Sequence, residues 1–277
     1  MPADMNELAD DLAAETVSLR ELVAGLDEAG WRRATPAPGW SIADQISHLA
    51  HFDEAAVASA VRPVEFRAEL ARAMAPDASG EDAAAIDPDK LAERYRTMPP
   101  ADLLVWFDTA RAELLATFRG LHHSVRVPWF GMHMSAASSL TARLMETWAH
   151  GQDVADTLGV RREPTGRLRH VAHIGVATRA FSFAAHGLPV PVEKVRVELL
   201  SPGLDMWLWG PPEAADRVTG SALDFCLAVT QRRHLDDTSL VVAGPVATQW
   251  MSIAQAFAGP PGAGRQPGQF ARKGPRP

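Results

Sequence analysis

Two residue types that bind divalent metals, glutamate and histidine, stand one helical turn apart in the second half of the chain. Glu146 and His150 lie within residues 139–158, whose apolar spacing predicts a helix that closes at Gly159. Positions i and i+4 share a helix face, and Asp153 falls within about 60° of His150 on that face. A carboxylate and an imidazole placed in this way can both reach one divalent ion. The spacing therefore predicts part of a metal site.

An earlier helix can supply a third ligand. Ser41 is a typical N-cap residue, and the apolar spacing after it predicts a helix over residues 42–61. His48 lies on the flank of its apolar stripe. A His/Glu/His set leaves a fourth coordination position for water or a substrate, which is the arrangement of catalytic zinc sites. Spacing alone also allows a plainer alternative, in which Glu146 and His150 form a solvated surface pair.

Four long helices would position these side chains. They are predicted over residues 5–26, 42–61, 89–121 and 139–158, with an interruption of the third at Pro99 and Pro100. Residues 63–88 are expected to form a short helix and a loop, and residues 122–138 an apolar, aromatic connection. The expected architecture is a helical bundle with one long crossover, over residues 1–160.

The pattern changes after Arg161. A helix is expected over residues 167–187, a hairpin of two strands over 195–200 and 205–210, a helix over 220–231, a strand over 239–242 and a last helix over 245–257. These elements predict a small α+β domain over residues 161–258. The segment 259–277 is rich in glycine and proline, carries basic but no acidic residues, and is expected to be a disordered tail. The fold class is therefore α+β.

Composition excludes several classes of function. The single cysteine, Cys226, rules out an intrachain disulfide and a cysteine-built zinc site, and its apolar neighbours predict a buried, inert thiol. With 27 Lys+Arg against 34 Asp+Glu, the net charge of -7 suits nucleic acid poorly. No apolar run approaches the ~20 residues of a membrane span. We expect a cytoplasmic protein that acts on a small molecule, without nucleic-acid or membrane partners.

Further side chains are candidates for supporting roles. Asp53 projects toward the apolar stripe of its helix, where it could orient a ligand histidine, or it could lie on the surface; Asp153 has the same two interpretations. Trp129 and His133 could form the wall of a pocket over the metal. The alternative is that they simply pack on the bundle.

Two sequence motifs resemble one known family. The run TPAPGWSIADQISHLAHFDEAA, from Thr35, and the run METWAHGQDVAD, from Met145, resemble the mycothiol-dependent maleylpyruvate isomerase-like, DinB-like metal-binding proteins. The resemblance implies that His48, Glu146 and His150 bind Zn²⁺ or another divalent metal in a DinB-like bundle. It also implies that the thiol mycothiol, bound to the metal, attacks an electrophilic substrate.

The C-terminal half carries a further part of this resemblance. The run VTGSALDFCLAVTQRRH, from Val218, resembles the second domain of two-domain actinobacterial members, which is similar to a sterol-carrier fold. The resemblance implies a catalytic arginine that binds a substrate carboxylate, and Arg232 or Arg233 is the nearest candidate. A solvated helix end is the alternative for both.

These observations favour a zinc-dependent enzyme, either a mycothiol-dependent isomerase or transferase, or one that uses metal-activated water. The alternative is a carrier of apolar small molecules with a structural metal. Coordination number separates the two, because a fourth protein ligand such as His51, Asp53 or Asp153 would close the site to a substrate.

Overall fold

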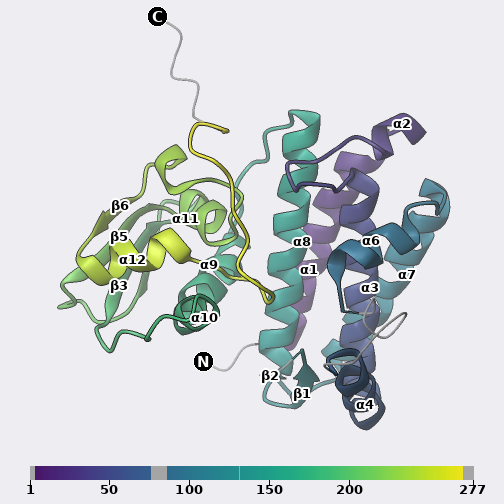
Figure 1. The fold of residues 1–277 in the computed structure, drawn as a ribbon, viewed down its shortest axis with the longest axis horizontal. Helices are drawn as coiled ribbons and strands as arrows, with labels where there is room; N and C mark the ends of the chain where they lie inside the picture. The colour runs from purple at the N-terminus through teal and green to yellow at the C-terminus, as the bar shows by residue number, and fades with distance from the viewer. Residues whose placement is uncertain (1–3, 76–85, 131, 271–277) are drawn as a thin grey trace, which may run out of the picture. The chain divides into compact units, whose positions relative to one another are not determined.

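The computed structural model describes residues 4–75, 86–130 and 132–270, which divide into two compact units, Met1–Arg162 and Glu163–Pro277. The first unit is helical and the second is built on a sheet (Figure 1). This arrangement confirms the expected α+β class, with a helical domain followed by a sheet domain. Across the described residues, no helix has the length and apolar character that crossing a membrane requires.

Four long helices form the first unit. They are α1 (Met5–Val23), α3 (Ile42–Val61), α7 (Pro100–Arg119) and α8 (Ala136–Leu158). Helix α3 packs against α7 and α8, and α1 packs against the same two helices. Fully buried side chains such as Leu19, Ile46, Phe107 and Val154 join them in one core. The predicted bundle is present.

Shorter elements connect these helices. They are α2 (Glu28–Trp31), α4 (Pro63–Ala73), α6 (Pro88–Tyr95), β1 (Arg126–Trp129) and β2 (Met132–Ser135). The predicted interruption falls between α6 and α7. Pro100 occupies the first turn of α7, where a backbone N–H has no partner within the helix, so proline is tolerated there although it has no N–H. The expected connection 122–138 contains an antiparallel β1–β2 hairpin in which Val127 faces Met134. Part of the expected loop, residues 76–85, lies outside the described residues.

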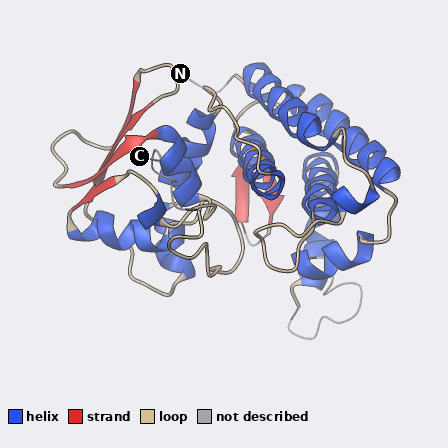
Figure 2. Cartoon of the chain, turned by 90° about the horizontal axis from the view of Figure 1, so that it is seen from above, coloured by secondary structure: helices blue, strands red, loops and turns tan. Residues whose placement is uncertain are grey.

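The second unit contains a four-stranded sheet in the order β4-β3-β5-β6. Its strands are β3 (Val195–Leu200), β4 (Met206–Trp209), β5 (Asp216–Ser221) and β6 (Val241–Ala243). The β3–β4 hairpin was predicted, whereas β5, which pairs with β3 in parallel, was not. Side chains on β3 alternate between buried and partly exposed, and Figure 2 shows the sheet with helices along one face.

The helices of this unit are α9 (Leu168–Ala177), α10 (Arg179–Ala185), α11 (Ala222–Val229) and α12 (Pro245–Ile253), with a 3-10 turn η1 (Leu235–Asp237). The single helix expected over 167–187 is divided at Thr178. Its hydroxyl donates to the carbonyl of Ile174 at 2.9 Å, and its ψ of 6° leaves the helical region. A threonine side chain competes in this way with the backbone ladder.

The tail over residues 259–277 was expected to be disordered. In the structure, the segment from Gly259 to Phe270 makes defined contacts. The backbone N–H groups of Gly268 and Phe270 donate to the Asp237 carboxylate at 2.8 and 3.3 Å. The guanidinium of Arg233 lies 4.1 Å from the centroid of the Phe270 ring. The last residues of the expected tail, 271–277, lie outside the described residues.

Candidate metal centre

Local capping fixes the two helices that carry the candidate ligands. Ser41 and Asp44 form a reciprocal capping box at the start of α3, with the Ser41 N–H donating to the Asp44 carboxylate at 2.7 Å. His48 follows in the second turn of α3. Helix α8 is capped by Ser135 and ends at Gly159, whose φ of 69° favours glycine. Both helices therefore begin at a residue with a capping hydrogen bond, which helps to fix the register of their side chains.

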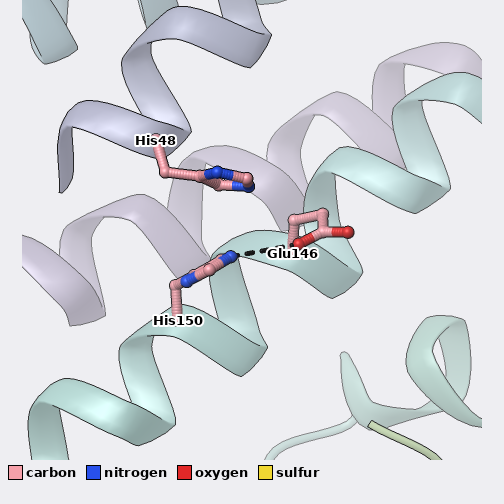
Figure 3. Close-up of side chains that lie close together, drawn as sticks. All are labelled: His48, Glu146 and His150. Atoms are coloured by element: carbon pink, nitrogen blue, oxygen red, sulfur yellow. Dashed lines mark hydrogen bonds and ion pairs between the residues drawn. The ribbon is translucent and has the colours of Figure 1, made fainter. Parts of the chain in front are cut away.

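The structure brings His48, Glu146 and His150 together (Figure 3). We call these three residues the His/Glu/His cluster. Their possible ligand atoms all lie within 4.8 Å of one another. The His48 and His150 ring centroids are 4.5 Å apart, and Nε2 of His150 is 3.2 Å from a carboxylate oxygen of Glu146. The side chains of His150 and Glu146 are 10% and 19% exposed, so the cluster is largely shielded from solvent.

These distances and atom types fit a divalent metal. Zinc bonds of about 2.0–2.1 Å in a tetrahedral site place neighbouring ligand atoms roughly 3.3 Å apart. The 3.2 Å between His150 and Glu146 already matches that spacing. Two imidazoles and one carboxylate form a common donor set for zinc, and three protein ligands leave one coordination position for a substrate or a thiol.

Gln45 sets the orientation of His150. Its amide Nε2 donates to the hydroxyl of Thr35 at 2.9 Å, and that hydroxyl donates to the carbonyl of Trp40 at 2.9 Å. Gln45 Oε1 is therefore the acceptor that faces His150 Nδ1, with which it forms a short hydrogen bond. Neutral His150 then carries its proton on Nδ1, which leaves the Nε2 lone pair for a metal. Such outer hydrogen bonds fix the tautomer and the ring orientation of metal-binding histidines.

Aromatic rings surround the two histidines. The Trp40 ring stacks on His150, with an interplanar angle of 15° and a centroid distance of 5.9 Å, and its centroid lies 5.3 Å from that of His48. Phe52 contacts the other side of His48 at 4.6 Å between centroids. The indole N–H of Trp40 donates to Asp89 on α6 at 2.7 Å, which fixes this ring. The rings exclude water and lower the local dielectric, so charges at the cluster interact more strongly.

Asp53 lies in the bundle interior and pairs with two arginines. Its carboxylate accepts from Nε of Arg111 at 2.7 Å and from Nε of Arg143 at 2.8 Å. Arg111 also donates to Thr147 at 3.0 Å. Burial lowers the pKa of Arg111, and the charge of Asp53 opposes that shift. The structure therefore places Asp53 in the interior, not on the surface, and its partners are two arginines that join α3, α7 and α8 instead of the expected ligand histidine.

The remaining expected site residues lie at different places in the structure. Asp153 is fully buried on α8, one turn after His150. Trp129 stacks on Phe66 at 6.3 Å between centroids and lies at the same distance from Phe52. His133 is exposed on β2. Roles for these three residues at the metal stay predictions.

Arg232 and Arg233 follow α11 in the C-terminal unit. Arg232 donates to the carbonyl of Thr230 at 2.8 Å, and Arg233 donates to the carbonyl of Arg232 at 2.6 Å. Their role in binding a substrate carboxylate stays a prediction. Sequence reasoning missed Gln45 as a partner of His150, although Gln45 stands one turn before His48 on the same helix face, which is a signal that it could reach the same site.

Comparison with protein families gives two matches. Residues 12–155 match the family described as mycothiol maleylpyruvate isomerase N-terminal domain, and this range contains all three members of the cluster. Residues 193–243 match a family described as wyosine base formation, over the strands of the C-terminal sheet.

Comparison with individual proteins finds relatives along the whole chain. An uncharacterized protein from each of two strains of Mycobacterium tuberculosis is 47% identical over 263 residues, which covers 95% of this chain and 100% of the relative. Among solved structures, the mycothiol-dependent maleylpyruvate isomerase superposes with a TM-score of 0.55 at 17% identity, covering 83% of this chain and 90% of that one. A histidine-to-alanine mutant of that enzyme gives a TM-score of 0.54 with the same coverage. The structural similarity shows a shared fold.

Proposed function

We propose that this chain, which belongs to the family of the mycothiol maleylpyruvate isomerase N-terminal domain, is an enzyme. It uses mycothiol and a divalent metal on a small electrophilic substrate. Zn²⁺ is the first candidate for the metal, with His48, Glu146 and His150 as its ligands. Isomerisation and thiol transfer are the candidate reactions. The observation that carries the proposal is the convergence of these three side chains, with His150 held by Gln45 in the tautomer that suits a metal.

A bound divalent metal supplies Lewis acidity, which lowers the pKa of a coordinated thiol or water and so provides a nucleophile at neutral pH. The protein supplies the orientation. Gln45 holds the His150 ring through Nδ1, and the carboxylate of Glu146 faces Nε2 of the same ring. Trp40 and Phe52 cover the histidines and exclude water from around them. Exclusion of water from this surrounding limits competing hydrolysis of the substrate.

Among the described residues, the cluster that could hold a metal has three members and contains none of the three candidates for a fourth ligand, which supports the enzyme over the carrier alternative. Asp53 was one candidate for a fourth ligand, and its carboxylate is engaged by Arg111 and Arg143. His51, another candidate, has Nδ1 3.4 Å from the hydroxyl of Tyr95. A carrier with a structural metal would need a fourth protein ligand, and it would co-purify with an apolar molecule visible by native mass spectrometry.

Product formation tests the proposal. The full chain, loaded with Zn²⁺, is incubated with mycothiol and a panel of small electrophiles that includes maleylpyruvate, and products are separated by liquid chromatography. We expect turnover of at least one electrophile that needs both the metal and the thiol. His48→Ala and Glu146→Gln should reduce turnover to background, whereas His122→Ala, which changes an exposed histidine, should not. Equal turnover without metal, or in His48→Ala, would contradict the proposal.

A further inference from the structure

A pocket between α3, α4 and the end of β1 has no part in the proposed function. Its volume is about 230 Å³, and all of its described lining residues belong to the helical unit. Helix α4 packs against both α3 and β1, and Figure 1 shows α4 and β1 together at one end of the bundle. Pockets for drug-sized ligands start at about 300 Å³, so this pocket suits a smaller ligand.

The inner wall of this pocket is apolar and partly aromatic. On the α3 side it is lined by the small side chains of Ala55 and Ala58, which leave room for a ligand. Phe66 of α4 is only 5% exposed, and its ring centroid lies 6.4 Å from that of Phe130 at an interplanar angle of 84°. The face of an aromatic ring carries partial negative charge, so such rings attract a cation that lies over them.

The charged groups of the wall leave one carboxylate uncompensated. Arg62 and Glu69 pair with each other at 2.5 Å, so their opposite charges offset one another. Glu54 is the other carboxylate, and among the described residues it has no basic partner at ion-pair distance. A neutral ligand that covered Glu54 would remove its charge from water without compensation, whereas a cation would compensate it.

The carboxylate of Glu54 is held in place from a neighbouring helix. The indole N–H of Trp106, on α7, donates to Oε1 of Glu54 at 2.7 Å. Within the part of the chain that the structure describes, Oε2 of Glu54 makes no hydrogen bond, so it can accept one from a ligand. A carboxylate fixed through one oxygen binds a ligand with less loss of side-chain entropy. His51, which also lines the pocket, is already engaged, with Nδ1 3.4 Å from the hydroxyl of Tyr95.

The combination of features distinguishes an organic cation from a metal ion. Among the described residues, only the His/Glu/His cluster brings three possible metal ligands together, so the acidic groups of this pocket do not form a second metal site. An organic ammonium ion can use both parts of the wall, because its positive charge faces the carboxylate and its carbon groups pack on the rings. Recognition of quaternary ammonium ligands by aromatic rings follows the same principle.

From these observations we propose that this pocket binds a small organic ammonium ion, with Glu54 as the counter-ion and Phe66 and Phe130 as the aromatic wall. The proposal does not depend on the metal, because no member of the His/Glu/His cluster lines the pocket. It assigns a ligand class to the α3–α4 side of the bundle.

Isothermal titration of the full chain tests this proposal. Choline is the probe in one arm, and the other arm uses its uncharged analogue in which carbon replaces nitrogen. We expect saturable binding of choline and much weaker binding of the analogue, since the two differ in charge and hardly in shape.

Substitutions in the wall then test the two recognition elements separately. Glu54→Gln removes the charge but keeps an acceptor for Trp106, and it should weaken choline binding about tenfold. Phe130→Leu keeps an apolar wall without a ring and should weaken binding about threefold. The matched control is Glu113→Gln, because Glu113 is exposed on α7 and does not line the pocket, so this variant should bind choline as the wild type does.

Two further measurements keep the result interpretable. Glu54 is exposed and Phe130 is half-buried, so both variants should fold, and thermal unfolding checks this. His48→Ala should bind choline unchanged, which separates this pocket from the metal centre. The proposal is overturned if choline does not bind saturably, if the uncharged analogue binds as tightly, if either pocket variant binds choline like Glu113→Gln, or if His48→Ala abolishes binding.

Discussion

Replacing Gln45 with methionine should weaken metal binding while the bundle stays folded. Gln45 is fully buried, and its Oε1 is the acceptor that faces Nδ1 of His150. Methionine has a similar length but cannot accept this hydrogen bond, so the His150 ring loses its preferred tautomer and orientation. Loss of such a partner typically weakens metal affinity by about 10–100-fold, which corresponds to about 1.4–2.7 kcal/mol.

A second substitution at the same position separates the acceptor from the fold. Gln45→Glu keeps an oxygen that accepts from His150 and replaces only the amide group that donates to Thr35. We expect its zinc affinity to stay within about tenfold of the wild type, because carboxylate partners also orient metal-binding histidines. The Thr35 hydroxyl has one proton, so in this variant it donates either to the new carboxylate or, as in the wild type, to the carbonyl of Trp40.

Competition with a chromophoric zinc chelator measures these affinities. Gln152→Met is the matched control, since Gln152 lies on α8 and donates to Asp156 at 2.9 Å without contacting His150. Thermal unfolding in the presence of a chelator shows whether each variant is folded. Wild-type affinity in Gln45→Met, or equal losses in the methionine and glutamate variants, would refute the argument from the tautomer.

Three further predictions concern the fold and its titrating groups. Asp53→Asn removes the charge that faces two buried guanidinium groups, so the free energy of unfolding in urea should fall by about 3–5 kcal/mol. The exposed control Asp108→Asn should lose less than ~1 kcal/mol. Equal losses in the two variants would contradict the role of Asp53 as the partner of the buried arginines. Burial raises the pKa of Tyr95 above 10.0, so ultraviolet titration of this single tyrosine should give a midpoint above that value. The contribution of Tyr95 to the free energy of unfolding should be full below pH 10.0 and should decline as the pH rises through the pKa of the folded state. Burial also raises the pKa of the Cys226 thiol well above 9.0. A thiol reagent at pH 8 should therefore label the native protein at a rate ~100-fold or more below that of the unfolded chain. Rapid labelling of the native protein would show that this thiol is accessible and would contradict the prediction.

The bundle could be predicted because its signals are local. Ser41 begins α3 through a capping box with Asp44, and Gly159 ends α8 in the left-handed conformation, as the sequence indicates. Apolar residues at helical spacing then determine which side of each helix faces the core. That spacing placed His48 and the Glu146/His150 pair on the flanks of their helices, and the resemblance of two motifs to a known family predicted that the three residues form one site.

The partners of these side chains could not be predicted, because they depend on contacts between distant segments. The arginines that pair with Asp53 stand 58 and 90 residues away in the chain. The hydrogen bond between Gln45 and His150 spans 105 residues. Spacing identifies a face of a helix but not the residue of another helix that meets it.

The sheet of the C-terminal unit shows the same limit. The β3–β4 hairpin is local and was predicted, whereas β5 follows β4 in the chain but pairs in parallel with β3, on the side of β3 away from β4. The sequence of β5, DRVTGS, carries only one strongly apolar residue, Val218, and its strand conformation depends on the neighbouring strands. Likewise, the contacts of Gly268 and Phe270 with Asp237 order a segment whose composition alone favours disorder.

Metal stoichiometry tests the central claim most directly. The wild-type chain is purified without chelators and its metal content is measured by inductively coupled plasma mass spectrometry, beside His48→Ala, His150→Ala and the control His122→Ala. The account predicts about one divalent ion per chain in the wild type and in the control, and loss of that ion in both cluster variants. A wild type without stoichiometric metal, or full metal content in His150→Ala, would contradict it.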